Sequence, residues 1–200
     1  MADSSTLLAL ETITTIATNS AIRDRIDLAR RRLRALWRVL GMITQGAPQS
    51  QILAAIEADL SGDDDSAEEL LKAALNGLEV DAGLLAMVGS TIRCFGIAHP
   101  GRWSTPCRRD HLATTVQLDE TTQRLRHALL HTRASSRAIA MTAQYPPRSA
   151  EWAALVAAAG EFARHATDYA QATLQQWNLM RLAAQTLFGS ATRLFAIGGA

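Results

Sequence analysis

The sequence predicts an all-α fold, and three observations carry that prediction. Alanine is abundant while valine, tyrosine and phenylalanine are scarce, a balance that favours helices over sheets. Apolar residues recur at steps of three and four through 22–43 and 152–194. The second of these stretches contains no proline, and Tyr145-Pro146-Pro147 ends the helical pattern before it. We therefore expect a six- to seven-helix bundle with a long C-terminal antiparallel helical hairpin.

The N-terminal part should hold the shorter helices. Ser4, Ser5 and Thr6 offer N-caps for a helix over about 7–18, and Asn19-Ser20 separates it from the next. That second helix, 21–44, ends at Gly46-Ala47-Pro48, and a short amphipathic helix follows over 51–60. Alternate steps of four and three give the second helix the most regular apolar seam of the chain, which consists of Ile22, Ile26, Ala29, Leu33, Leu36, Leu40 and Ile43.

Two further helices are expected between residues 66 and 98. Ser66 should cap the first, with Glu68 and Glu69 in its first turn, and Asn76-Gly77 should stop it. From Leu78 to Ala98 the chain is nearly all apolar, which predicts the most deeply buried helix. Its longest apolar run, 82–92, is too short for a membrane span, so we expect no membrane partner.

The expected organisation is a single helical domain, 1–200. Its N-terminal helices occupy 1–98, an irregular loop bracketed by prolines occupies 99–109, and the long helical hairpin occupies 110–200. The two hairpin helices should run over about 110–144 and 151–195, with Ser149 as the cap of the second. The first ten residues lack the basic segment of a signal peptide and two cysteines make no disulfide framework, so a cytoplasmic protein is expected.

The net charge of +1 hides a segregation along the chain. Residues 1–50 carry seven Arg against four acids, 51–92 carry one Lys against nine acids, and 93–150 carry nine Arg against three acids. Nineteen of the twenty basic residues are Arg, which makes planar bidentate contacts to phosphate and carboxylate. High genomic GC content, which enriches Arg and Ala together, is the competing explanation of this bias.

Two basic stretches are candidates for binding nucleic-acid backbone. One is the polar face of the second helix, with Arg31, Arg34 and Arg38. The other is the loop and its flanks, where an aromatic side chain between arginines could stack a base: Arg93, Arg102, Trp103, Arg108 and Arg109. The alternative for both sets is a solvated face or pairing with the acidic segment.

The same loop suggests one structural zinc ion. Cys94, His99, Cys107 and His111 alternate within eighteen residues, and two thiolates with two imidazoles can complete a closed tetrahedral shell. Their spacing matches no standard zinc finger, so the competing interpretation is that Cys94 is a small buried helix residue and the others belong to the loop.

A second constellation lies in the hairpin. His127 and His131 are four apart on one helix, and Glu161 and His165 are four apart on the other. Antiparallel pairing about the turn would set His127 opposite His165 and His131 opposite Glu161, as in a catalytic metal site. Interhelical or surface hydrogen bonding is the alternative, because nearby arginines would repel a cation.

No phosphate loop, dinucleotide fingerprint or nucleophile elbow occurs, so an enzyme is disfavoured. The sequence favours a non-catalytic helical subunit of a larger assembly that contains nucleic acid. Other protein subunits or self-association complete the expected partners, with the acidic segment of one copy meeting the basic block of the next, head to tail. A metal-dependent enzyme centred on the hairpin histidines, or a pure protein-interaction module of effector or immunity type, are the alternatives.

Overall fold

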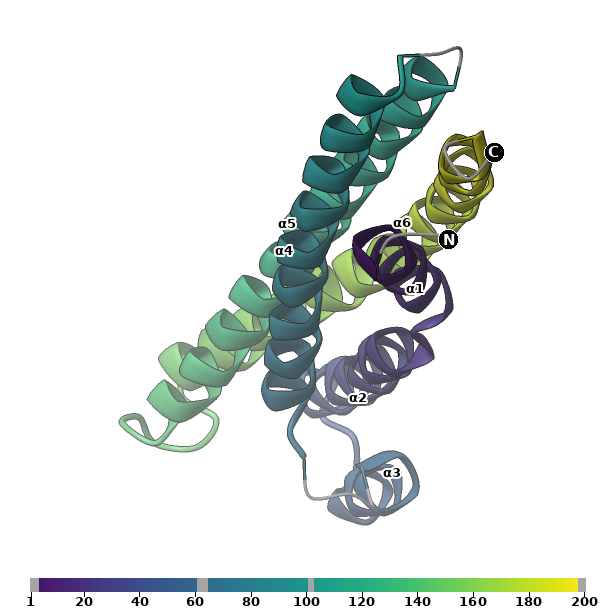
Figure 1. Ribbon diagram of the computed structural model, residues 1–200. Helices are drawn as coiled ribbons and strands as arrows, with labels where there is room; N and C mark the ends of the chain where they lie inside the picture. Colours follow the sequence, from purple (N-terminus) through teal and green to yellow (C-terminus); the bar gives the residue numbers. More distant parts are fainter. Residues whose placement is uncertain (1–3, 61–64, 101–102, 198–200) are drawn as a thin grey trace. The chain divides into compact units, whose positions relative to one another are not determined.

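All regular secondary structure in the described part of the chain is α-helical, which confirms the predicted fold class (Figure 1). The computed structural model describes residues 4–60, 65–100 and 103–197. Six helices lie in these ranges: α1 (Ser4–Thr18), α2 (Ser20–Thr44), α3 (Gln49–Leu60), α4 (Ala67–Ala98), α5 (Ser104–Thr142) and α6 (Ala150–Ile197).

The helices divide into two compact units, each with its own core. The first unit comprises Met1–Arg23, Asn76–Gln123 and Gln175–Ala200, and the second comprises Asp24–Leu75 and Arg124–Leu174. The largest fully buried side chains of the first unit include Ile13, Ile16, Leu78, Leu85, Ile92, Leu118 and Trp177. Those of the second unit include Ile26, Leu33, Leu71 and Leu125.

The apolar seam of α2 faces the protein interior along most of its length. Five of its seven residues are buried, namely Ile22, Ile26, Ala29, Leu33 and Leu40. In the second unit Leu40 packs with Ala138 of α5 and Val156 of α6, while Leu36 and Ile43 lie partly buried against this cluster. Burial of the seam is less complete toward the C-terminal end of α2, where Leu36 and Ile43 lie at the edge of this cluster.

Local chemistry sets three of the helix ends as the sequence predicted, namely the starts of α4 and α6 and the end of α2. Ser66 and Glu69 form a reciprocal capping box, in which the Ser66 amide donates to the Glu69 carboxylate (2.8 Å) and the Glu69 amide donates to Ser66 Oγ (3.2 Å). These hydrogen bonds lower the pKa of Glu69. The amide of Trp152 donates to Ser149 Oγ at the start of α6, and Gly46 takes a φ of 71° where α2 ends.

The helix stop expected at Asn76-Gly77 is wrong, because α4 continues through both residues to Ala98. The glycine serves packing instead of termination. A Cβ placed on Gly77 would lie 2.8 Å from Cδ1 of Ile22, so only glycine lets α4 approach that buried side chain so closely. Close approach offsets the backbone entropy that glycine costs inside a helix.

Two glycines of α4 should respond oppositely to alanine. Gly83 has open space where a Cβ would stand, so Gly83→Ala should stabilise the protein by about 0.5–1 kcal/mol. Gly77→Ala should destabilise it by about 1 kcal/mol, because overpacking against Ile22 exceeds the gain in helix propensity. Ile22→Val removes the Cδ1 atom in the way, and it should make Gly77→Ala less costly in the double variant. Urea unfolding of the parent, Gly83→Ala, Gly77→Ala, Ile22→Val and the double variant checks this. Additive effects of Gly77→Ala and Ile22→Val on the free energy of unfolding would contradict it.

The expectation that 78–98 forms the most deeply buried helix is also wrong. Its inner side is buried at Leu78, Leu85, Val88 and Ile92, but Val80, Met87 and Ile97 are 62%, 59% and 76% exposed. By length and composition α4 could cross a membrane, although the apolar run 82–92 alone was too short to predict this. In its most apolar window, 33% of the residues are buried. Core helices of soluble proteins meet the same criterion, so the finding carries little weight alone. An uncharged face of α4 is nevertheless exposed.

The predicted irregular loop is shorter than expected, since α4 extends to Ala98 and α5 begins at Ser104. Thr105-Pro106 therefore lies in the first turn of α5, where proline needs no amide donor. After α5 ends at Thr142, a short connection leads to α6, the longest helix. In the second unit α5 and α6 pack closely, and Ser135 Oγ donates to the carbonyl of Ala159 (2.9 Å).

Buried threonines satisfy their hydroxyls within their own helices. Thr114, Thr122 and Thr132 of α5 each donate to the carbonyl four residues earlier, at 2.8–2.9 Å. Thr167 of α6 does the same. A buried hydroxyl without a partner would cost free energy, and this local bond removes that cost without using a group on a neighbouring helix.

Candidate functional site: the basic end of α4 and α5

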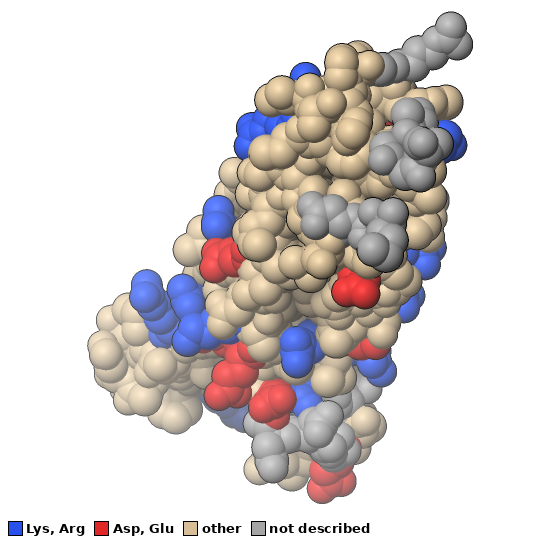
Figure 2. All heavy atoms as spheres, in the orientation of Figure 1, with Lys and Arg blue, Asp and Glu red and all other residues tan. Residues whose placement is uncertain are grey.

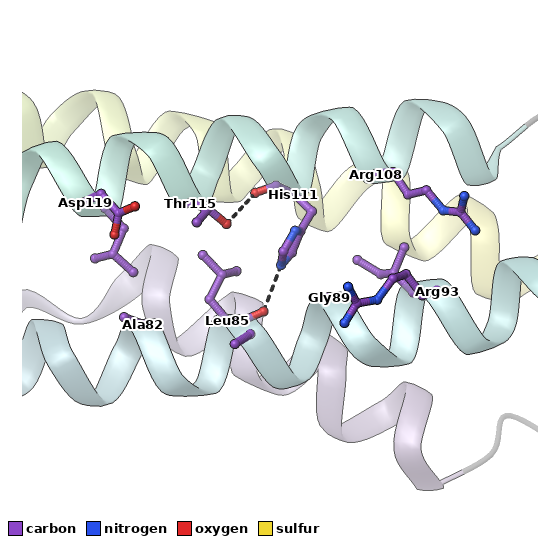
Figure 3. A pocket seen from close by; sticks show the side chains of 11 residues that line it. Ala82, Leu85, Gly89, Arg93, Arg108, His111, Thr115 and Asp119 are labelled. Carbon is purple, nitrogen blue, oxygen red and sulfur yellow. Dashed lines mark hydrogen bonds between the residues drawn. The ribbon is translucent and has the colours of Figure 1, made fainter.

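A groove of about 420 Å³ runs between α4 and α5 in the first unit (Figure 3). Its lining combines apolar residues with five polar or charged ones on the two helices. The apolar part includes Leu85, Ile92 and Leu118, and the others are Arg93, Arg108, His111, Thr115 and Asp119. Figure 3 places the two arginines toward one end and Asp119 toward the other, so the groove is electrostatically polar along its length.

His111 crosses the groove from α5 to α4, as Figure 3 shows. Its Nε2 lies 2.8 Å from the carbonyl oxygen of Leu85, which can only accept, so Nε2 must carry the proton. The ring reaches that carbonyl because Gly89 lies beneath it, and a Cβ on Gly89 would come within 2.6 Å of the imidazole. The contact fixes the orientation of the imidazole ring across the groove.

The two groove arginines are held by α4 at the end where α4 and α5 connect. The guanidinium of Arg108 lies against Gly96, where a Cβ would come 3.3 Å from its terminal nitrogen. Arg93 donates from its guanidinium to Ser90 Oγ at 3.1 Å. Both side chains keep further N–H groups for an anion, since each guanidinium carries five donors.

Aromatic side chains and a third arginine adjoin this pair. The Arg193 guanidinium of α6 lies 5.0 Å from the ring centroid of Trp103, a cation–π distance. Phe95 packs edge-on against Phe195, and its ring centroid lies 4.6 Å from that of the exposed His99. We call Arg93, Trp103, Arg108 and Arg193 the basic end, to which α4, α6 and the start of α5 all contribute.

The other predicted nucleic-acid contacts are placed differently. Arg31 forms an ion pair with Asp27 (3.3 Å), and Arg109 lies 3.4 Å from Asp110, so part of their charge is neutralised within the chain. Arg34 is exposed, and Arg38 has an interaction within the chain. The α2 arginines belong to the second unit and the loop arginines to the first, and Arg102 lies outside the described residues.

Figure 2 shows one face of the protein, on which Lys and Arg occur in small groups, several of them next to Asp or Glu. The segregation of charge along the sequence is therefore partly cancelled in space. One such pair joins the acidic and basic segments within the second unit, where Arg133 donates to Glu68 at 2.8 Å.

The four candidate zinc ligands have separate surroundings. Cys94 is exposed on α4, whereas Cys107 is fully buried on α5, where burial raises its thiol pKa to about 11. The ring of His99 lies tilted against Phe95, and His111 donates a hydrogen bond to the Leu85 carbonyl. Among the described residues no three His, Cys, Asp or Glu side chains are grouped so that they could hold a metal ion. Much of the predicted loop is helical, so Cys94 lies in α4 while Cys107 and His111 lie in α5.

The three hairpin histidines lie close together in the second unit, and two of them contact the ring of Tyr169. His127 and His131 both stack on Tyr169, with centroid distances of 5.1 and 5.4 Å. His131 also lies 5.4 Å from His165, and its pKa is lowered by burial and by its two histidine neighbours. Glu161, by contrast, pairs with Arg164 of its own helix. The sequence pairing missed Tyr169, although it follows His165 by one helical turn.

One buried acid was not identified from the sequence. Asp81 of α4 is 4% exposed, and its Oδ2 has no hydrogen-bond partner among the described residues. Burial raises the pKa of this carboxyl to about 6. The sequence did contain a sign of this burial, because Asp81 lies inside the apolar stretch that begins at Leu78.

Comparison with protein-family models, curated proteins and solved structures finds no match to this chain. The chemistry of its own side chains is therefore the basis for a functional proposal.

Proposed function

We propose that the protein is a non-catalytic helical subunit of a larger assembly, and that it binds nucleic-acid backbone through the basic end. Its scaffold is the predicted helical bundle with a long C-terminal hairpin. The observations that support the proposal are two: Arg93 and Arg108 line the same groove between α4 and α5, and Arg193 lies over the partly exposed Trp103 just before α5. Within residues 4–60, 65–100 and 103–197, none of these three guanidinium groups forms an ion pair with a carboxylate.

This arrangement suits phosphate and not base edges. Arginine binds phosphate through paired N–H groups, and each phosphate contact releases counterions. In the part of the chain that the structure describes, no helix presents a row of amide and guanidinium groups suited to groove reading, so binding should not depend on sequence. Trp103, partly exposed beside the arginines, favours single strands, whose unstacked bases are free to stack on aromatic rings.

The test is fluorescence anisotropy with labelled single-stranded and duplex oligonucleotides of mixed sequence. Affinity should fall steeply between roughly 50 and 200 mM salt. Arg93→Glu, Arg108→Glu and Arg193→Glu together should weaken binding at least about tenfold and reduce the slope of log affinity against log salt by about 3.

The matched control changes Arg25, Arg124 and Arg137 to Glu, because these exposed arginines lie outside the basic end and give the same change in net charge. It should bind nearly as the parent does. A second set, Arg31→Glu, Arg34→Glu and Arg38→Glu, tests the α2 stripe. Equal losses in all three variants would show a diffuse charge effect and would overturn a localised site. A parent that does not bind at micromolar concentration in low salt would end the proposal.

A protein-interaction function is the second candidate, and the exposed apolar face of α4 favours it. A metal-dependent enzyme has less support, because Glu161 pairs with Arg164 and the described residues group no three metal-binding side chains.

A further inference from the structure

A separate pocket of about 420 Å³ lies in the first unit, between the connection from α1 to α2 and residues 177–185 of α6. We call it the Trp177 pocket, because this buried ring forms part of its wall. Polar side chains from both segments make up most of the remaining lining, namely Asn19, Ser20, Arg23, Asn178, Arg181 and Gln185. Among the described residues no acidic side chain lines it, unlike the groove between α4 and α5, where Asp119 is present.

The electrostatics of the Trp177 pocket favour an anion. Arg181 is exposed on α6 and, within the described ranges, forms no ion pair with a carboxylate. Arg23 lies in the first turn of α2, where acidic side chains are the usual choice and this helix has none. Since Arg23 also has an interaction within the chain, Arg181 is the principal cation of the pocket. Two guanidinium groups and the start of a long helix thus adjoin one cavity, an arrangement that a bound anion would stabilise.

Trp177 adds an uncharged hydrogen-bond donor to these cations. Its side chain is only 2% exposed, yet among the described residues no group accepts a hydrogen bond from its indole N–H. The nitrogen is also not sealed from solvent, since it is not one of the enclosed atoms without a partner. A tryptophan buried to this degree usually finds an acceptor for that group. Because the ring lines the pocket, an oxygen atom bound there can supply the missing acceptor.

The amide side chains of the pocket suit a larger ligand than a bare anion. Asn178, Arg181 and Gln185 are spaced by three and four residues, so they share one face of α6. Each amide offers both donors and an acceptor, which match hydroxyl groups or ring nitrogens beside the anionic group. A volume of about 420 Å³ lies within the range of small-ligand pockets and exceeds what one phosphate group fills.

We propose that the Trp177 pocket binds a small phosphate monoester whose organic part carries hydroxyl groups, as in a sugar phosphate or a nucleoside monophosphate. The phosphate contacts the Arg181 guanidinium through paired N–H groups, and the organic part contacts Asn178 and Gln185. Phosphate is favoured over carboxylate because its three oxygens and nearly two negative charges can serve both arginines and the indole N–H. The inference goes beyond the basic end, whose four residues do not line this pocket.

Isothermal titration calorimetry with adenosine 5′-monophosphate and ribose 5-phosphate tests the proposal, each against its unphosphorylated counterpart, adenosine or ribose. Both esters should bind at least about tenfold more tightly than the counterparts, because charge-assisted hydrogen bonds require the phosphate. Arg181→Gln should weaken ester binding by about tenfold or more. Arg25→Gln is the matched control, since Arg25 is exposed on α2 and does not line the pocket. It should change the affinity by less than about twofold, because solvent screens its charge.

Tryptophan fluorescence locates the bound ester. Ester binding should change the fluorescence of the parent, and Trp177→Phe should remove that change while it retains most of the aromatic bulk. Trp177→Phe also lacks the indole N–H, so its affinity for both esters should fall. A fluorescence change that persists in Trp177→Phe would place the ester elsewhere and overturn the assignment to this pocket.

Oligonucleotide anisotropy separates this proposal from nucleic-acid binding. Arg181→Gln leaves the basic end unchanged and should bind oligonucleotide as the parent does, whereas the triple basic-end variant should still bind the esters. Loss of oligonucleotide binding by the parent would therefore overturn only the basic end. The Trp177 pocket is overturned if neither ester binds at about 10 mM, or if esters and unphosphorylated counterparts bind equally. Equal losses in Arg181→Gln and Arg25→Gln would also overturn it.

Discussion

Trp177→Ala should lower the free energy of unfolding by about 3–5 kcal/mol, the largest effect we expect from one substitution in this protein. Trp177 is 2% exposed and is the largest fully buried side chain of the first unit. Truncation removes its transfer free energy and leaves a cavity, and helices rich in small residues have few long side chains with which to fill it. Urea unfolding, followed by far-ultraviolet circular dichroism, measures the change.

Trp37 offers the control for this prediction, because the same residue type on α2 is 37% exposed. Trp37→Ala should cost clearly less, about 2 kcal/mol or less, since more than a third of the Trp37 surface is already in contact with solvent. If both substitutions shift the urea midpoint equally, Trp177 does not occupy the core position assigned to it.

Asp81→Asn should remove a pH dependence of stability worth about 2–3 kcal/mol. The pKa of Asp81 rises from 3.8 to about 6 on burial, so the folded state holds this proton more tightly than the unfolded chain does. Between pH 3.8 and about 6 the folded protein therefore binds more protons, and stability contributed by this group falls as pH rises. Above about pH 6 the full cost of burying an unpaired carboxylate is present.

The measurement compares urea unfolding of the parent and Asp81→Asn at about pH 4 and pH 7. The difference between the two proteins should change by about 2–3 kcal/mol from one pH to the other, in favour of the variant at neutral pH. Other titrating groups are common to both proteins and cancel in this comparison. An unchanged difference would mean that Asp81 is solvated in the folded state.

The sequence predicted helices well where local signals and periodicity agreed. The seam of α2, the Ser66 capping box and the Ser149 cap all follow from residues close together in the chain. The helix end predicted at Gly77 was wrong because a glycine looks the same in the sequence whether it ends a helix or lets another side chain approach closely. Only the position of Ile22, distant in sequence, distinguishes the two.

The candidate site was predictable in composition but not in arrangement. Arg93, Arg108 and Trp103 could be selected from the sequence, and they do belong to one region of the first unit. Arg193 was missed, because it stands in the helical periodicity of α6 without any basic neighbour. Burial also escaped prediction for α4, since an apolar sequence does not reveal which of its faces another helix covers.

The buried threonines have a consequence for how this chain could diverge. The Thr132 hydroxyl donates to the carbonyl of Ala128 on its own helix. Replacement of Thr132 by valine or alanine therefore leaves no polar group on a neighbouring helix without its hydrogen bond. Gly89 has no such freedom, because the ring of His111 already fills the volume of its missing side chain. Descendants of this sequence should drift readily at the threonines while Gly89 and His111 change together or not at all. That coupled pattern would mark true relatives among the many alanine- and arginine-rich helical sequences of similar composition.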